Sequence, residues 1–199
     1  MTTAHDDATR IARDYYNSSD ADNFYYHVWG GEDIHVGLYM GEVEPIADAS
    51  RRTVRHMADR AGPITKEMRV LDIGAGYGGA ARQLAGRFGC HVTALNLSEA
   101  ENERNRKMNR EQGLEDRIDV VDGAFENLPF DDASFDLVWC QDAILHSGDR
   151  ARVFDEVDRV LRPGGTFVFT DPMRTDDADV SRLRPILERI HLSDLGSPG

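Results

Sequence analysis

Several features that would direct a protein to a membrane, a secretory route or a metal are missing from these 199 residues. No run of about 18 apolar residues occurs, so a membrane-spanning helix is not expected. The first ten residues, MTTAHDDATR, are polar and acidic, which argues against a signal peptide. Cys90 and Cys140 stand far apart and form no metal-binding or redox motif. We therefore expect buried thiols, no metal site and a cytoplasmic protein.

Lysine is nearly absent, because the basic residues are almost all arginine and only Lys66 and Lys107 are lysines. The formal net charge is -13, and the acidic residues are spread along the chain. Nucleic-acid binding needs clustered basic side chains, so a nucleic-acid partner is not expected. A dispersed acidic surface suits a protein that works in high salt, where screening weakens self-repulsion. It suits an ordinary acidic bacterial protein equally well.

What the sequence does contain is an alternation of strand and helix patterns. Two helical patterns, at 7–16 and 45–61, come first. Short apolar segments typical of buried strands follow, separated by further helical patterns, and lie within 69–76, 91–97, 117–125, 135–145 and 166–171. Five such alternations predict an α/β fold, in which a parallel sheet carries helices on both faces. Ligands bind such sheets beyond the carboxyl ends of the strands, so the loops at those ends should surround the site.

A glycine-rich turn follows the first expected strand. Gly74, Gly76 and Gly79 fit the spacing G-x-G-x-x-G, which suits dinucleotide binding as well as a simple tight turn. Asp72 stands at the end of the strand, where a carboxylate favours a cationic ligand group over a pyrophosphate. Asn96 follows the second strand, in place of the acid that commonly binds ribose hydroxyls there.

Three motifs together resemble the class I S-adenosylmethionine-dependent methyltransferases. They are D-x-G-x-G-x-G at 72–78, LPFDDASFDLVW at 128–139 and RVLRPGG at 159–165. The resemblance implies a Rossmann-like sheet and S-adenosylmethionine as the cofactor. It also implies the cofactor-binding residues, which are Asp72 near the methionine end, Gly74 and Gly76 in the turn, Asn96 at the ribose, Leu97, Ala124 and Phe125 around the adenine, and Gln141.

The acceptor side is indicated by an aromatic N-terminal segment. Five of the six tyrosines precede residue 40, and Trp29 lies among them. Ring faces attract cations by about 0.5–2 kcal/mol, so a cage of rings would favour an amine that becomes a methylated ammonium group. The same rings could instead be the packed core of a cap. The candidate substrate-binding residues are Tyr26, Trp29, His35 and Tyr39.

The loop after the fourth strand, QDAILHSGD, supplies the candidate catalytic residues. His146 is the best-placed base, because an unperturbed histidine titrates near neutral pH. Asp142 would either face an ammonium group or fix the loop.

Residues 15–39 and 140–149 resemble the bacterial sarcosine/dimethylglycine N-methyltransferases that make glycine betaine. This resemblance implies a catalytic tyrosine–histidine pair, matched here by His146 and by Tyr16 or its neighbour Tyr15. It implies N-methylation of a small amine, with residues 1–62 as a helical, aromatic cap at the substrate site and residues 63–199 as the cofactor-binding domain.

Some alternatives stay open at this point. The family sheet has seven strands, and the last two are not found in the sequence, so a non-catalytic cofactor-binding fragment is one reading. Two further readings are a methyltransferase with a phosphoethanolamine-type acceptor and a small-molecule O- or C-methyltransferase. The number of methyl groups added stays open, and so does the choice between a monomer and a homodimer.

Overall fold

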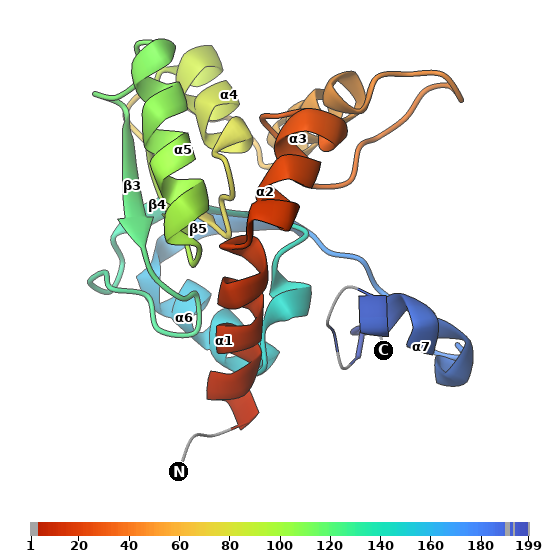
Figure 1. The fold of residues 1–199 in the computed structure, drawn as a ribbon. Helices are drawn as coiled ribbons and strands as arrows, with labels where there is room; N and C mark the ends of the chain where they lie inside the picture. Colours follow the sequence, from red (N-terminus) through yellow and green to blue (C-terminus); the bar gives the residue numbers. More distant parts are fainter. Residues whose placement is uncertain (1–3, 190–191, 193, 199) are drawn as a thin grey trace.

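Five parallel strands form one sheet in the computed structural model, which describes residues 4–189, 192 and 194–198 (Figure 1). The strand order is β3-β2-β1-β4-β5. The strands are β1 (Arg69–Ile73), β2 (His91–Asn96), β3 (Ile118–Asp122), β4 (Phe135–Gln141) and β5 (Leu161–Thr170). Because the order reverses direction beside β1, the loops after β1 and β4 diverge and leave space for a ligand at this edge.

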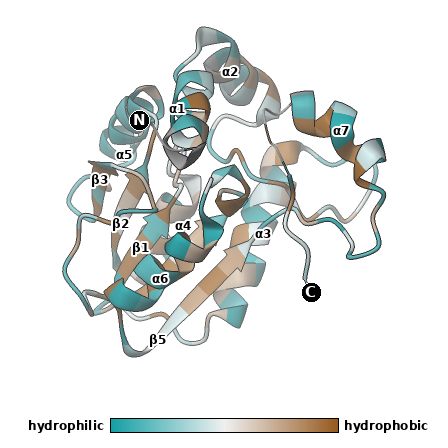
Figure 2. Cartoon of the chain, turned by 90° about the horizontal axis from the view of Figure 1, so that it is seen from below, coloured by the Kyte–Doolittle hydropathy of each residue, from teal (hydrophilic) through white to brown (hydrophobic). Residues whose placement is uncertain are grey.

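Helices cover both faces of the sheet, as the alternation predicts. On one face, α3 (Ile46–Arg60) and α4 (Gly79–Phe88) pack on a cluster that includes Val70 and Trp139. On the other face, α6 (Arg150–Val160) packs on a cluster that includes Leu71 and Val138. Neighbouring strand residues alternate between the two clusters, as expected when side chains point to opposite faces. The buried strands are largely brown in Figure 2, whereas the polar helix α5 (Glu99–Glu111) is largely teal.

The predicted strands are confirmed, but the predicted start of the fifth strand is wrong. The fifth strand was expected within 166–171, yet β5 already begins at Leu161. Its pairing with β4 is irregular between Phe135 and Leu137, and Gly164 takes φ 82°, which glycine adopts without strain. The last described helix, α7 (Val180–Arg189), carries the helical pattern of the C-terminal segment.

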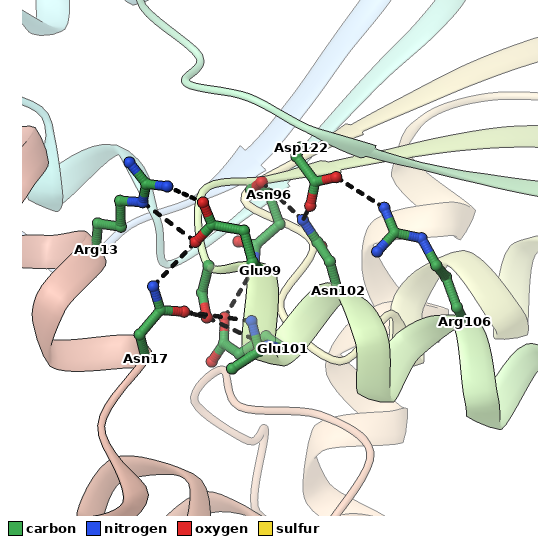
Figure 3. Close-up of polar contacts among 10 residues, drawn as sticks. Arg13, Asn17, Asn96, Glu99, Glu101, Asn102, Arg106 and Asp122 are labelled. Atoms are coloured by element: carbon green, nitrogen blue, oxygen red, sulfur yellow. Dashed lines mark hydrogen bonds and ion pairs between the residues drawn. The ribbon is translucent and has the colours of Figure 1, made fainter.

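The N-terminal segment contains more helical turns than the two expected. Helix α1 (Ala4–Tyr16) is followed by α2 (Ser19–Phe24) and by a π-helical turn, η1 (Tyr25–Trp29). Figure 3 shows Arg13 of α1 and Asn17, the residue after this helix, bonded to Glu99 at the start of α5. These bonds hold α1 against the carboxyl end of β2, and so the cap lies beside the edge where the ligand site is expected.

Membrane spans and metal-binding clusters were searched among the residues that the structure describes. No helix among them is long and apolar enough to cross a membrane. No group of three or more potential metal-ligating side chains occurs among them. Cys90 and Cys140 are both buried and free.

Candidate active site

A cavity of about 670 Å³, including its open side, lies at the carboxyl ends of the strands and reaches α1. The short helix η2 (Ile144–His146) forms part of its wall. Ten of the predicted site residues line it, namely Tyr16, Gly74, Gly76, Asn96, Leu97, Ala124, Phe125, Gln141, Asp142 and His146.

The glycine turn leaves no space for side chains. Gly74 has φ 75°, and a Cβ atom added there would lie 2.4 Å from the Cβ of Ala143. Gly76 has φ 52°, and its added Cβ would lie 2.7 Å from Ile34. Both conformations are unfavourable for other residues. The bare backbone of this turn can therefore approach a ligand closely.

A second, smaller cavity adjoins the turn and is lined by Asp33, His35, Asp72 and Gln141, among others. Asp72 is 2% exposed, and burial raises its pKa to about 7. Its Oδ2 atom has no hydrogen-bond partner among the described residues, and neither has Nε2 of Gln141. Trp139 donates to Oε1 of Gln141 (2.8 Å), which fixes the amide so that Nε2 remains available to donate.

These buried groups are complementary to the ammonium and carboxylate groups of an amino acid. An unpartnered carboxylate favours an ammonium group, and an unpartnered amide N–H favours a carboxylate. His35 lies in the same place, with Nε2 3.3 Å from Asp33 Oδ1. Burial, the largest single influence, lowers the pKa of His35, but the bond to Asp33, the Val36 carbonyl and the charges of the nearby carboxylates together outweigh it and raise the pKa. The methionine end of S-adenosylmethionine carries both groups, so these residues fit it.

Glu101 is a cavity residue that the sequence analysis missed. The motif S-E-A-E predicts a helix cap, and Ser98 Oγ does accept a bond from the Glu101 N–H (3.2 Å). The carboxylate of Glu101, however, accepts from Asn96 Nδ2 (2.8 Å), is 3% exposed as a residue, and lines the cavity (Figure 3). Asn96 and Glu101 together therefore present an amide and a carboxylate at the cavity wall.

Tyr16 and His146 meet inside the cavity. The Tyr16 hydroxyl lies 2.9 Å from Nε2 of His146, and the rings are edge to face at 5.4 Å. Burial lowers the pKa of His146 to about 4 and raises the pKa of Tyr16 well above its ordinary value. Both groups are therefore neutral near pH 7, so the imidazole can accept a proton.

Asp142 connects the loop after β4 to the cap. Its Oδ2 accepts a bond from the Val36 N–H (2.6 Å), and its φ of 50° is unusual for a residue other than glycine. Such strain is found at functional sites that the surrounding structure holds in place. Two roles were predicted for Asp142, facing an ammonium group or holding the loop in place, and this bond supports the second.

Of the four candidate substrate-binding residues, His35 lines the smaller cavity, whereas Tyr26, Trp29 and Tyr39 line neither of the two cavities. Tyr26 is 39% exposed, and the guanidinium of Arg104 lies 4.0 Å from its ring centre, outside the cavity lining. Tyr39 is 45% exposed and also outside. Trp29 packs edge-on against Tyr25, whose ring stacks on Tyr16 at 6.0 Å. The π-helical turn gives Tyr25 and Tyr26 different neighbours, which sequence spacing could not reveal.

Comparison with known proteins gives consistent matches. Residues 71–169 match the methyltransferase domain family. The whole chain is 60% identical to a sarcosine/dimethylglycine N-methyltransferase of Halorhodospira halochloris and covers 71% of that protein. Over 98% of its length it is 62% identical to a glycine/sarcosine/dimethylglycine N-methyltransferase of Actinopolyspora halophila, of which it spans 34%. The crystal structure of a protein described as a sarcosine dimethylglycine methyltransferase from Galdieria sulphuraria has a TM-score of 0.85 and 47% identity, and the match covers 91% of this chain and 70% of the other.

Proposed function

We infer the function of this chain from one premise: it belongs to the family of sarcosine/dimethylglycine N-methyltransferases. The cofactor is S-adenosylmethionine. We propose that the chain methylates the nitrogen of sarcosine, dimethylglycine or both, with glycine betaine as the end product. The observation that carries this proposal is the hydrogen-bonded Tyr16–His146 pair inside the cavity, 2.9 Å from oxygen to nitrogen.

The cofactor residues are assigned from the partners that the buried groups need. Asp72 would face the ammonium group, and Gln141 with His35 would face the carboxylate. Glu101 and Asn96 would hold the ribose hydroxyls. Apolar side chains would enclose the adenine, and these are Leu97, Ala124 and Phe125. When bound, S-adenosylmethionine supplies an electrophilic methyl carbon.

The Tyr16–His146 pair acts on the acceptor nitrogen. Aliphatic amines, with a pKa near 10, are mostly protonated at neutral pH and must lose a proton before the lone pair can react. Tyr16 and His146 line the cavity as neutral groups, and the imidazole can accept that proton through the Tyr16 hydroxyl, which gives its own proton to Nε2 as it takes the one from the amine. Tyr25 stacks on Tyr16, and Trp29 packs edge-on against Tyr25, so these rings hold the Tyr16 side chain in place. Asp142 positions the cap by holding Val36.

Several wider features belong to the same proposal. Residues 1–62 act as the cap at the substrate site, and residues 63–199 as the cofactor-binding domain. The partner is a small amine and not a nucleic acid, and the protein works in the cytoplasm as a monomer or homodimer. An acidic, lysine-poor composition is in keeping with the synthesis of an osmoprotectant in a salt-loving organism.

The test is a methyl-transfer assay with labelled S-adenosylmethionine in molar salt, against sarcosine, dimethylglycine and phosphoethanolamine. We expect transfer to the first two. Tyr16→Phe and His146→Asn should each lower kcat by about 10²–10⁴-fold, the usual contribution of acid–base catalysis. His56→Asn, on the outer part of α3, is the matched control and should keep full activity. Transfer to phosphoethanolamine alone would contradict the proposal.

A further inference from the structure

The short helix η2, which carries His146, is held in place partly by groups outside it. Two backbone bonds close the turn: the His146 N–H donates to Ala143 O (3.0 Å), and the Ser147 N–H donates to Ile144 O (2.9 Å). Neither bond involves Leu145, the residue directly before His146. In so short a helix, side chains must satisfy backbone groups that the helix itself leaves free. The partners of Leu145 therefore help to determine where His146 lies.

Two charged side chains bind the backbone of Leu145. Its N–H donates to Oδ1 of Asp171 (3.2 Å). Its carbonyl oxygen accepts a bond from Nη2 of Arg150 (3.3 Å), the first residue of α6. Hydrogen bonds to ionised groups are stronger than bonds between neutral ones. The Leu145 backbone is thus held from two sides, by the end of a strand and by the start of a helix.

The end of β5 also holds the start of this loop. Asp171 directly follows β5, and Thr170, the last residue of the strand, accepts a bond from the Asp142 N–H (2.8 Å). Burial raises the pKa of Asp171 to about 6, and the bond from Leu145 is the largest influence that opposes this rise. Neither Asp171 nor Arg150 lines either cavity of the site. Any effect of these two side chains on the reaction therefore passes through the turn.

We propose that Asp171 and Arg150 are positioning residues, which hold the turn so that the imidazole of His146 stays within hydrogen-bond reach of the Tyr16 hydroxyl. This inference rests on the proposed N-methylation for its effect on catalysis. A proton passes directly between the two groups only at hydrogen-bond distance, and Nε2 of His146 lies 2.9 Å from the Tyr16 oxygen. A catalytic group that is displaced by about 1 Å can lose about 10²-fold in rate. The two bonds to the Leu145 backbone therefore act on the pair although neither side chain touches a ligand.

The first test is a double-mutant cycle with Asp171→Ala and His146→Asn, assayed with sarcosine. Asp171→Ala alone should lower kcat about 10-fold or more, with the KM for sarcosine and the cofactor Kd within about twofold of wild type. In the His146→Asn protein the same change should cost less than about twofold, because no imidazole remains to be positioned. Asp171→Asn keeps an oxygen that can accept from the Leu145 N–H, so it should recover most of the lost activity. Arg150→Ala should show the same pattern as Asp171→Ala, although it also removes a bond to Asp194 O (2.9 Å) and is the less specific change.

A second measurement needs no methyl transfer. The ring nitrogen signals of His146 in nuclear magnetic resonance, identified by their absence in His146→Asn, report the bond to Tyr16. In Asp171→Ala they should move towards the positions seen in Tyr16→Phe, where that bond is missing. Asp136→Ala is the matched control, because Asp136 also accepts a backbone bond, from the Arg69 N–H (2.8 Å), at the amino end of β1. This control should leave the His146 signals and kcat unchanged while the stability of the protein falls.

Other results would overturn the positioning role. Equal losses of kcat from Asp171→Ala in the wild-type and His146→Asn proteins would indicate a general structural role instead. Wild-type kcat and unmoved His146 signals in both Asp171→Ala and Arg150→Ala would show that the turn needs neither contact. A wild-type protein that methylates neither sarcosine nor dimethylglycine would remove the proposed function, and the His146 signals would then decide the positioning role by themselves.

Discussion

The buried carboxyl group of Asp72 makes the stability of the cofactor-free protein depend on pH. Burial raises its pKa from 3.8 to about 7; the charge of His35 opposes this rise only in part, and the charge of Asp33 adds to it. At 1.36 kcal/mol for each pKa unit, this difference corresponds to about 4 kcal/mol. A raised pKa means that the folded state binds the extra proton. The stability from this group is therefore full below pH 3.8, falls as the pH rises towards 7, and is lost above that.

Asp72→Asn removes the ionisation and keeps the shape. Without cofactor, we expect the variant to be more stable than wild type at pH 8, by up to about 4 kcal/mol, and about 3 kcal/mol of this gain should disappear at pH 5. Urea unfolding at both pH values measures the difference. The same variant should bind S-adenosylmethionine at least about 10-fold more weakly, because the ammonium group loses its carboxylate.

Asp136→Asn provides a control of opposite sign. Bonds from the Arg69 N–H and Arg162 outweigh partial burial and lower the pKa of Asp136, so its contribution to stability is present above the ordinary pKa and is lost in acid. Its replacement should destabilise the protein at pH 8. If Asp72→Asn gave no gain at pH 8, or the same gain at both pH values, the reasoning about this buried carboxyl group would be refuted.

Three further changes have defined outcomes. Gly74→Ala should weaken cofactor binding by about 10-fold or more in calorimetry, since the new Cβ meets Ala143 at 2.4 Å and φ is 75°; unchanged affinity would show that the turn adapts. Glu101→Gln should raise the cofactor Kd about 10-fold and leave the KM for the amine unchanged, and the opposite pattern in steady-state kinetics would exclude the ribose assignment. Arg13→Ala should lower the unfolding free energy by less than about 1 kcal/mol, because its bond to Glu99 is solvent-exposed; a loss above about 2 kcal/mol in urea would show that this contact anchors α1.

The sheet and the cofactor end of the site could be predicted because their signals are local. Glycines at the end of the first strand and polar residues at the ends of the others identify one edge of a parallel sheet. Gly74, Asn96, Gln141 and His146 all lie at the cavity as a result. Their positions follow from strand order and do not depend on the details of side-chain packing.

The cap could not be predicted to the same depth. Tyr25 and Tyr26 are adjacent in the sequence, but Tyr25 stacks on Tyr16 and Tyr26 lies against Arg104. That difference arises in a π-helical turn, which has no recognisable sequence pattern here. Glu101 could not be recognised as a cavity residue, because the sequence S-E-A-E at 98–101 predicts a capping box whether or not its carboxylate also faces a ligand. The cluster of Asp33, His35 and Asp72 forms only when distant segments fold together.

The most direct test of the account is to follow the product by mass spectrometry, with trideuteromethyl-labelled S-adenosylmethionine and sarcosine in molar salt. The account predicts labelled dimethylglycine, glycine betaine or both in wild type, and strongly reduced product in Tyr16→Phe and His146→Asn. A protein that binds the cofactor and transfers no label to sarcosine or dimethylglycine would contradict it.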